Sequence, residues 1–408
     1  MAGVVIVGAG HGGSQCAASL RDAGYEGAVT LIDVEGVTPY HKPPLSKAYL
    51  KDADANPQLL RAETFYTDQD IEVRHNTSVV SIDRDGKSVA LADGSSLPYE
   101  YLVLATGAAP RMPDLEGIDL DGVFALRTLD DAQRLRSASA EAKNVVVIGG
   151  GFIGMEAACT FSGQGKNVTV VEMAPRILGR AVAPIISEHV HNRCKDMGVR
   201  IITSMAPEAI EGEGSVSGVR LADGEVIACD LVVVGIGVVP ETGLAEAAGL
   251  ACDNGVSVDG RMQTSDPSIF AIGDCCNYHH WQADRKVRLE SVQNATDQAR
   301  HVAKAITGDD TTYREVPWFW SDQGDMKLQM VGLSFEPDRF LVSGDSGENA
   351  FAVYHFKNGN LIAIDTINRP ADHMLGRKFI EAGFTPSDED ILEGPAKLKQ
   401  LFKDLRRA

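Results

Sequence analysis

Paired cysteines are what this 408-residue sequence most clearly lacks. It has seven cysteines, an odd number, and none of them has Cys-x-x-Cys spacing. Cys275 and Cys276 are adjacent, which strains a disulfide ring, and Cys16 falls in a helical segment where a small core residue is the default interpretation. A disulfide-stapled secreted fold is therefore excluded, and a redox thiol pair of the usual disulfide-reductase spacing is absent.

Net positive charge and long apolar runs are also lacking. The formal net charge is -19, which argues against general nucleic-acid binding and against docking on an anionic membrane. No apolar run approaches the ~20 residues of a membrane helix, and no signal peptide precedes the first strand pattern. With 44% hydrophobic and 23% charged residues, the chain is predicted to be a globular cytoplasmic protein with two or three domains.

Metal-ligand spacing is missing as well. Tyr278-His279-His280-Trp281 holds two adjacent histidines, but neighbouring side chains point apart and no acid or cysteine has the spacing of a metal ligand. We interpret this segment as a loop and predict no metal site. Ser46 and Ser291 have no His-Asp arrangement beside them, so nucleophilic catalysis is not supported.

Two glycine fingerprints are present, each behind an apolar run typical of a buried strand. Val4–Val7 leads into the first, and residues 145–148 lead into the second. In such a motif one glycine permits the tight turn, another lets backbone approach a pyrophosphate, and a third lets the helix pack against the sheet. The predicted contacts are Gly8, Gly10, Gly12 and Gly13 in the first motif, and Gly149, Gly151, Ile153 and Gly154 in the second.

An acidic residue follows the next strand pattern in both halves. Asp33 or Glu35 is placed to hydrogen-bond ribose in the first half. Glu172 closes the corresponding strand in the second half, where a carboxylate favours the 2′-hydroxyl of NAD over the 2′-phosphate of NADP. Arg176 and Arg180 lie nearby and weaken this preference, yet NADH is the predicted cofactor.

The two fingerprints mark an internal duplication that sets the domain plan. Apolar strands end at Thr106-Gly107 and at Gly273-Asp274, and the second half has a matching strand that ends at Gly235 and Gly237. With the two fingerprints, these strand ends resemble the flavoprotein disulfide-reductase architecture. The resemblance implies an FAD-binding domain over residues 1–110 and 240–315, an NAD-binding domain over 111–239, and a C-terminal domain over 316–408. The fold class is α/β, with two Rossmann-like domains of glutathione reductase type and a C-terminal α+β domain with an antiparallel sheet.

Longer motifs then identify a family. The chain contains Pro43-Pro44-Leu45-Ser46-Lys47, the run Gly149 to Glu156, Arg127-Thr128-Leu129, residues 288–292 and residues 317–323, which read Pro-Trp-Phe-Trp-Ser-Asp-Gln. It closely resembles the oxygenase-coupled, NADH-dependent ferredoxin reductases of the putidaredoxin reductase type, essentially over its whole length. This resemblance implies bound FAD, NADH as reductant, and a 2Fe-2S ferredoxin that supplies a monooxygenase or dioxygenase.

The resemblance also implies roles for single residues. Lys47, paired with Glu156, is expected beside the flavin, with Trp320 near the isoalloxazine ring and Glu290 near the nicotinamide. Where the family commonly has Gly-Asp, this chain has Asp33-Val34, so either Asp33 or Glu35 is the candidate for the FAD ribose. The implied FAD contacts are Asp33, Val34, Glu35, Lys47, Val79, Thr106, Gly107, Arg127, Gly273, Asp274, Val292 and Trp320.

Other interpretations remain open. Lys47 is alternatively a solvated lysine, Glu156 an acid favoured by the helix dipole, and Trp320 a core aromatic residue on the same face of an extended segment as Trp318. The alternative functions are a rubredoxin reductase, an NADH oxidase, or a flavin-bearing interaction protein similar to apoptosis-inducing factor. Because the chain is acidic, an acidic ferredoxin needs a local basic patch, for which Arg285, Lys286 and Arg288 are candidates.

Overall fold

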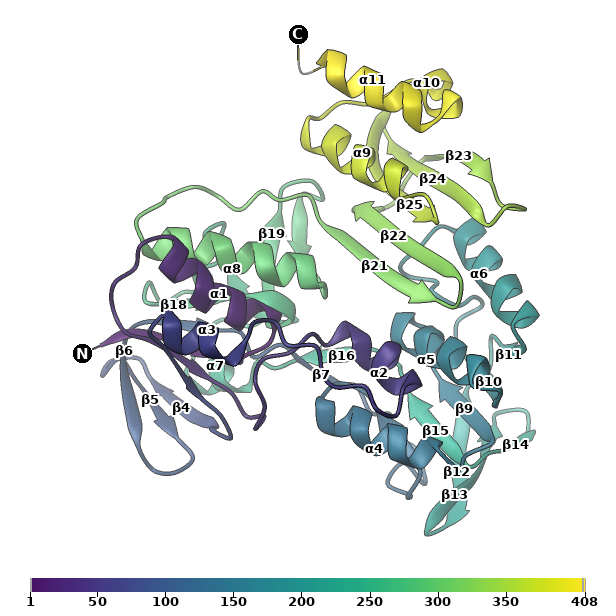
Figure 1. Ribbon diagram of the computed structural model, residues 1–408, viewed down its shortest axis with the longest axis horizontal. Coiled ribbons are helices and arrows are strands. Elements are labelled where there is room, and N and C mark those ends of the chain that lie inside the picture. Colours follow the sequence, from purple (N-terminus) through teal and green to yellow (C-terminus); the bar gives the residue numbers. More distant parts are fainter. Residues whose placement is uncertain (1, 406, 408) are drawn as a thin grey trace. The chain divides into compact units, whose positions relative to one another are not determined.

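The computed structural model describes residues 2–405 and 407, which form two compact units (Figure 1). The first unit holds residues 2–41, Pro57–Ala109 and Val239–Pro317. The second holds Lys42–Asn56, Pro110–Val238 and the chain from Trp318 onward. The strands β7 (Ala108–Pro110) and β16 (Val238–Pro240), where the chain leaves one unit for the other, form a two-stranded ribbon. The mixed α/β class predicted from the sequence is confirmed.

A seven-stranded sheet of order β3-β2-β1-β6-β5-β4, with β18 also paired to β6, organises the first unit. Its parallel strands are β1 (Gly3–Val7), β2 (Val29–Ile32), β3 (Ile71–Arg74), β6 (Ser96–Leu104) and β18 (Ile269–Ala271). The hairpin of β4 (Val79–Asp83) and β5 (Ser88–Leu91) adds antiparallel strands beside β6. Every residue of β1 and β2 is buried, as a parallel strand covered on both faces requires.

Helices and a second, smaller sheet complete the first unit. Helices α1 (His11–Asp22) and α8 (Val292–Ile306) pack against each other. The remaining elements are α3 (Glu63–Asp68), α7 (Gly243–Ala247), the 3₁₀ helix η2 (Gly273–Cys275), β17 (Val256–Val258), β19 (Cys276–His280) and β20 (Arg285–Val287). The last three strands form a sheet in the order β17-β19-β20.

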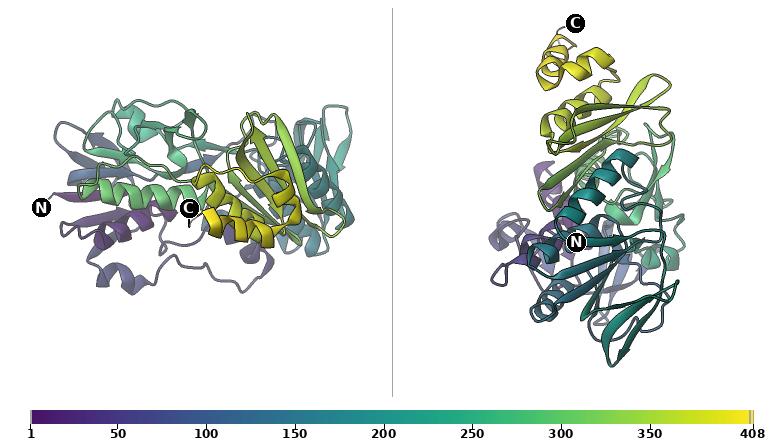
Figure 2. Two further views of the ribbon diagram at one scale, coloured as in Figure 1. Left: turned by 90° about the horizontal axis from the view of Figure 1, so that it is seen from above. Right: turned by 90° about the vertical axis from the view of Figure 1, so that its right-hand side faces the viewer.

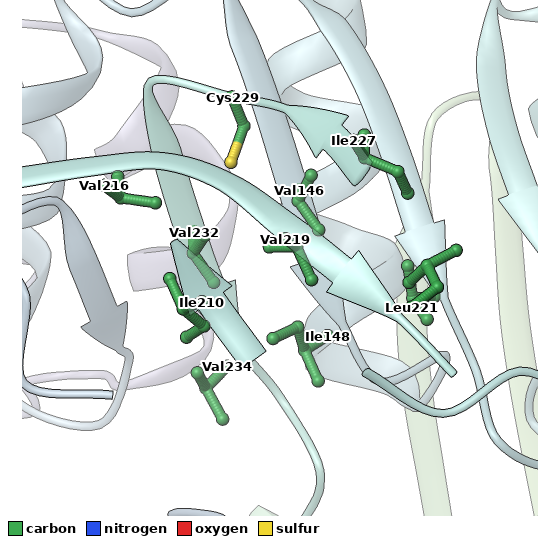
Figure 3. Close-up of a cluster of buried hydrophobic side chains, with 11 residues drawn as sticks. Val146, Ile148, Ile210, Val216, Val219, Leu221, Ile227, Cys229, Val232 and Val234 are labelled. Carbon is green, nitrogen blue, oxygen red and sulfur yellow. The ribbon is translucent and has the colours of Figure 1, made fainter. Parts of the chain in front are cut away.

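The second unit repeats the parallel plan in a five-stranded sheet of order β11-β10-β9-β15-β8. These strands are β8 (Val123–Ala125), β9 (Asn144–Ile148), β10 (Asn167–Val171), β11 (Val199–Ile202) and β15 (Leu231–Val234). The associated helices are α2 (Ala48–Lys51), α4 (Leu129–Ser139), α5 (Phe152–Gly163) and α6 (Pro184–Asp196), and a meander follows with β12 (Pro207–Glu213), β13 (Ser215–Leu221) and β14 (Val226–Ala228). Figure 3 shows Val146, Ile148 and Val232 of the sheet packed against Ile210 and Val219 of the meander.

An antiparallel sheet of order β21-β22-β25-β24-β23 ends the second unit. Its strands are β21 (Trp318–Gln323), β22 (Met326–Gly332), β23 (Arg339–Asp345), β24 (Ala350–Lys357) and β25 (Asn360–Ile367). Helix α9 (Pro370–Glu381) packs on β22 and β25, with α10 (Asp388–Glu393) and α11 (Pro395–Leu405) beyond it (Figure 2). The predicted C-terminal antiparallel sheet is thus present, while the predicted boundaries of the three domains stay a prediction.

Two sequence interpretations were wrong. The prolines within residues 38–47 predict a loop without a regular element, but Pro43–Ser46 forms the 3₁₀ helix η1. Two prolines suit a first helical turn because their φ is already helical and that turn needs no N–H partner. The second error concerns His279 and His280, which lie on strand β19 rather than in a loop. His280 is buried and His279 exposed, so their side chains do point apart.

Candidate functional site

The first fingerprint joins β1 to α1 in the first unit. Gly8 has φ +104°, and a Cβ on it would lie 2.3 Å from the carbonyl oxygen of Ala105. A Cβ on Gly13 would lie 1.8 Å from the carbonyl oxygen of Gly8, so helix and turn are in direct contact here. Beside Gly10 there is open space, and no side chain caps the start of α1. The arrangement therefore suits a pyrophosphate, which needs close backbone approach and free N–H groups.

The acids that follow β2 differ in their surroundings. Asp33 is buried at the strand end, whereas Val34 is 67% exposed. The Glu35 carboxylate accepts a 2.6 Å hydrogen bond from the Tyr40 hydroxyl. Glu35 is therefore held by its own loop, and Asp33 occupies the strand-end position at which an acid binds ribose.

Backbone turns from two further strands belong to the same unit. The Thr106 hydroxyl donates to the carbonyl oxygen of Glu241 at 2.7 Å, and Gly107 has φ +73°. The Gly273 N–H donates to the Gln298 side-chain oxygen at 2.7 Å, which fixes the turn that carries Asp274. Gln298, on α8, is completely buried, and the sequence analysis missed it because glutamine in a helix has no distinctive pattern.

Glu290 and Val292 lie around the start of α8, and Val79 begins β4 in the same unit. Arg288 pairs with Glu290 at 2.8 Å and donates to the carbonyl oxygen of Asp274 at 3.2 Å. The Arg288 side chain is only 10% exposed, so this residue is a poor docking residue for a partner. Lys286 is more exposed and pairs with Asp253 at 3.4 Å.

The second fingerprint joins β9 to α5 in the second unit and repeats the geometry of the first. A Cβ on Gly154 would lie 2.1 Å from the carbonyl oxygen of Gly149, the counterpart of the Gly13 contact. Gly151, the counterpart of Gly10, has no atom within 3.4 Å of such a Cβ. Gly235 directly follows strand β15, and its carbonyl oxygen faces this turn. Gly237 has φ +107°. Ile153 is 38% exposed.

Glu172 closes β10 and is hydrogen-bonded to the fingerprint itself. Its carboxylate accepts from the Gly150 N–H at 2.7 Å and from the Ala174 N–H at 2.7 Å. The guanidinium of Arg176 donates to the carbonyl oxygens of Val182 and Gly179, so it is engaged within its own loop. The Glu172 carboxylate therefore lies directly against the second fingerprint, the place where such motifs carry a ribose-binding acid.

Lys47 and Glu156 are brought together in the second unit, although they are far apart in sequence. The Lys47 ammonium lies 2.6 Å from Glu156 Oε2, and it also donates to the carbonyl oxygen of Pro43. The Ser46 hydroxyl donates to the same carboxylate oxygen at 2.6 Å, and the Ser321 hydroxyl donates to Oε1 at 2.6 Å. Ser46 and Ser321 were missed as site residues because an isolated serine carries no spacing signal.

Trp320 lies on β21, in the same strand as Ser321. The rings of Trp318 and Trp320 are 5.6 Å apart, and Phe319 instead packs at 4.6 Å from Phe152 of α5. Residues 318–323 form the extended segment that the sequence predicts. Arg127 precedes α4 in the same unit, and its N–H donates to the Asp131 carboxylate at 3.1 Å.

The cysteines are all free thiols. Burial raises the pKa of Cys16 to about 12 and also raises the pKa of Cys275. Cys159 and Cys194, distant in sequence, have sulfurs 3.6 Å apart, and the pKa of Cys194 is raised by that contact and by burial. Because thiolates are the reactive form, Cys16, Cys194 and Cys275 are poor nucleophiles.

Within residues 2–405 and 407, no group of three or more His, Cys, Asp or Glu side chains is arranged to hold a metal ion. In the same residues, every helix is too short or too polar to cross a membrane.

Comparisons with known proteins match nearly the whole chain. Residues 2–299 match the family described as pyridine nucleotide-disulphide oxidoreductase, and residues 318–402 match the family described as reductase C-terminal. The chain is 42% identical to rhodocoxin reductase of Rhodococcus erythropolis, over 98% of this chain and 96% of that protein. It is 43% identical to a rubredoxin-NAD(+) reductase of Pseudomonas putida, over 90% and 96% respectively.

Solved structures that resemble this chain are also ferredoxin reductases. The ferredoxin reductase for the CYP199A2 system of Rhodopseudomonas palustris superposes with a TM-score of 0.96 at 46% identity, covering 98% of this chain and 100% of that one. The covalent putidaredoxin reductase–putidaredoxin complex gives a TM-score of 0.94 at 38% identity, covering 100% and 99%. The predicted resemblance to the putidaredoxin reductase type is confirmed.

Proposed function

Because the chain belongs to the pyridine nucleotide-disulphide oxidoreductase family, we propose that it is an NADH-dependent ferredoxin reductase. It carries FAD and delivers electrons to a 2Fe-2S ferredoxin that serves a monooxygenase or dioxygenase. The observation that carries this proposal is the match, over almost the full length of both chains, to structures of a ferredoxin reductase and of a reductase–ferredoxin complex. A cytoplasmic location is part of the proposal.

The first unit is assigned to FAD. Its fingerprint has open space beside Gly10 and an uncapped helix start, which fit a pyrophosphate. Asp33 is assigned to the adenosine ribose, because the alternative acid Glu35 is already held by Tyr40. Asp274, on the turn that Gln298 fixes, is proposed as a second FAD contact. We propose the other FAD contacts that the family resemblance implies as well.

The second unit is assigned to NADH. Glu172 places a carboxylate beside the fingerprint, which favours a ribose hydroxyl and disfavours a phosphate. Glu290, paired with Arg288, stays the proposed residue for the nicotinamide. The preference for NADH over NADPH therefore rests on charge at one position.

FAD, when bound, accepts a hydride from NADH and releases its electrons singly to a one-electron acceptor. Lys47 is proposed to assist reduction of the flavin, because its ammonium can stabilise negative charge that develops on the isoalloxazine. Glu156 holds that ammonium at 2.6 Å, and Trp320 is assigned to the packing around the ring. The protein thus supplies position, electrostatics and exclusion of water.

Steady-state reduction of a panel of 2Fe-2S ferredoxins, with NADH and NADPH side by side, tests the function. We expect rapid reduction of at least one ferredoxin and a clear preference for NADH. FAD-loaded protein that reduces ferricyanide but no ferredoxin would contradict the proposal.

A rubredoxin is the alternative acceptor, since a rubredoxin-NAD(+) reductase is 43% identical to this chain. Including rubredoxin in the same panel distinguishes the two functions, because the physiological acceptor is expected to give the higher kcat/KM. Oxygen consumption in the absence of a carrier protein separates both from an NADH oxidase.

A further inference from the structure

A buried carboxylate is held from three sides in the second unit. Glu156, on α5, is 5% exposed, and both of its oxygens accept hydrogen bonds. Oε2 receives Lys47 and Ser46, and Oε1 receives Ser321. The donors therefore come from two separate segments, residues 43–47 and β21, and they converge on a side chain of α5.

Ser321 is the donor that comes from farthest along the chain. It is completely buried, and its hydroxyl has Glu156 at 2.6 Å and the Gln323 amide nitrogen at 3.3 Å. The Gln323 amide donates to the Ser321 oxygen, which leaves the Ser321 proton for the carboxylate. This direction suits an ionised acid, since an ionised carboxylate only accepts hydrogen bonds.

The position of Glu156 in turn fixes Lys47. A lysine side chain has four rotatable bonds, so a single ion pair orients it only if the carboxylate is itself fixed. Ser321 fixes Oε1 and so leaves Oε2 directed at the ammonium, with the Pro43 carbonyl as the second acceptor at 3.1 Å. The hydroxyl of Ser321 thereby acts on the ammonium without touching it.

We propose that Ser321 is a positioning residue that sets the place of the Lys47 ammonium through Glu156, so that β21 tunes the reduction of bound FAD. The inference rests on the proposed function, because it assigns Lys47 to the flavin. A purely structural role for Ser321 is the competing interpretation, since β21 also lies against α5 (Figure 1). The rings of Phe319 and Phe152 are in contact between these two elements.

Three variants separate these interpretations. Ser321→Ala removes the donor to Oε1, Ser321→Thr keeps it, and Phe319→Leu weakens contact between the same two elements without touching the carboxylate. Each FAD-loaded variant is reduced anaerobically with NADH in a stopped-flow instrument, and its midpoint potential is measured by titration. The melting temperature of the apoprotein reports structural damage.

We expect Ser321→Ala to slow flavin reduction about tenfold, because displacing a charged group from its working position costs this order of rate. Its midpoint potential should fall, since reduced flavin loses a stabilising positive charge. Ser321→Thr should restore both values, and Phe319→Leu should lower the melting temperature but leave rate and potential unchanged.

Wild-type rate and potential in Ser321→Ala would overturn the inference. Equal changes of potential in Ser321→Ala and Phe319→Leu would overturn it as well, because they would show a general packing effect. These measurements use no ferredoxin. A wild-type protein that NADH reduces, but that reduces no ferredoxin, would contradict the proposed function and leave this test valid.

Discussion

At the scale of single residues, charge placement decides the chemistry. Lys47 has a buried carboxylate as its partner, and Glu172 holds a negative charge against its own glycine turn. Both acids are fixed by hydrogen bonds rather than free in solvent, so their charges act at defined positions. Substitutions that keep the shape and remove the charge therefore test the assigned roles most directly.

Glu156→Gln should slow reduction of bound FAD by NADH about tenfold, because the Lys47 ammonium loses its counter-charge and its fixed position. The free energy of unfolding should fall by about 1–3 kcal/mol, since a buried charge-assisted network is disrupted. Stopped-flow absorbance and chemical denaturation measure the two effects. Glu141→Gln, at an exposed position, is the control, and an equal loss of rate in it would contradict the assignment.

Glu172→Gln should lower the ratio of kcat/KM for NADH to that for NADPH, by about tenfold if one charge contact worth ~1.4 kcal/mol is lost. The amide oxygen can still accept from the Gly150 N–H, whereas the amide nitrogen no longer accepts from the Ala174 N–H. Steady-state kinetics with ferricyanide measures this ratio. Glu188→Gln on α6 is the control, and an unchanged ratio in Glu172→Gln would contradict the NADH assignment.

At the scale of elements, each fingerprint contains two glycines that are needed for different reasons. Gly13 is required by contact between helix and turn, as the 1.8 Å approach shows. Gly10 is surrounded by open space, so a need for glycine at this position would come from the proposed FAD rather than from the protein. The same division holds at Gly154 and Gly151 in the second fingerprint.

Gly10→Ala and Gly13→Ala should therefore fail in different ways. Gly10→Ala should keep the apoprotein melting temperature close to wild type, with at most about 1 kcal/mol lost at the helix N-cap, but bind FAD much more weakly. Gly13→Ala should destabilise the apoprotein itself, because the added methyl overlaps backbone. Calorimetry of apoprotein and FAD titration distinguish them. Equal destabilisation of both apoproteins would contradict this account.

At the scale of the whole molecule, buried histidines couple stability to pH in both units. Burial lowers the pKa of His280 and of His373 to about 4, from 6.5. The folded protein therefore binds fewer protons than the unfolded chain between these values, and stability is lost as pH falls from about 6.5 to 4. Each histidine contributes about 3 kcal/mol to this loss.

Urea unfolding at several pH values should therefore show proton uptake on unfolding in this interval. His280→Phe should reduce the uptake near pH 5 by about one proton, with His373 still contributing. An unchanged pH slope in His280→Phe would show that His280 titrates normally in the folded protein.

The overall charge of -19 makes the ferredoxin complex depend on local basic residues. Arg285→Glu should raise KM for an acidic ferredoxin severalfold and leave ferricyanide reduction unchanged. Lys143→Glu, an exposed substitution in the other unit, is the control. Equal losses with both acceptors in Arg285→Glu would indicate damage to folding or FAD binding instead.

The two fingerprints, the strands before them and the family could all be predicted from the sequence alone. These features are local, because glycine conformation and the burial of a short apolar run depend on neighbouring residues. The longer motifs, such as residues 317–323, identify the family because their residue types occur together in one chain. Pro43–Ser46 and His279–His280 were misjudged, since propensity alone does not show how a segment packs.

The residues that surround the charged side chains could be identified only in the folded protein. Ser46 and Ser321 reach Glu156 across 110 and 165 residues of chain, and Gln298 reaches Gly273 across 25. Arg288 likewise turned out to be engaged with Glu290 rather than exposed for a partner. Such contacts have no sequence pattern, because they are set by how helices and strands pack, and that packing is a property of the folded units.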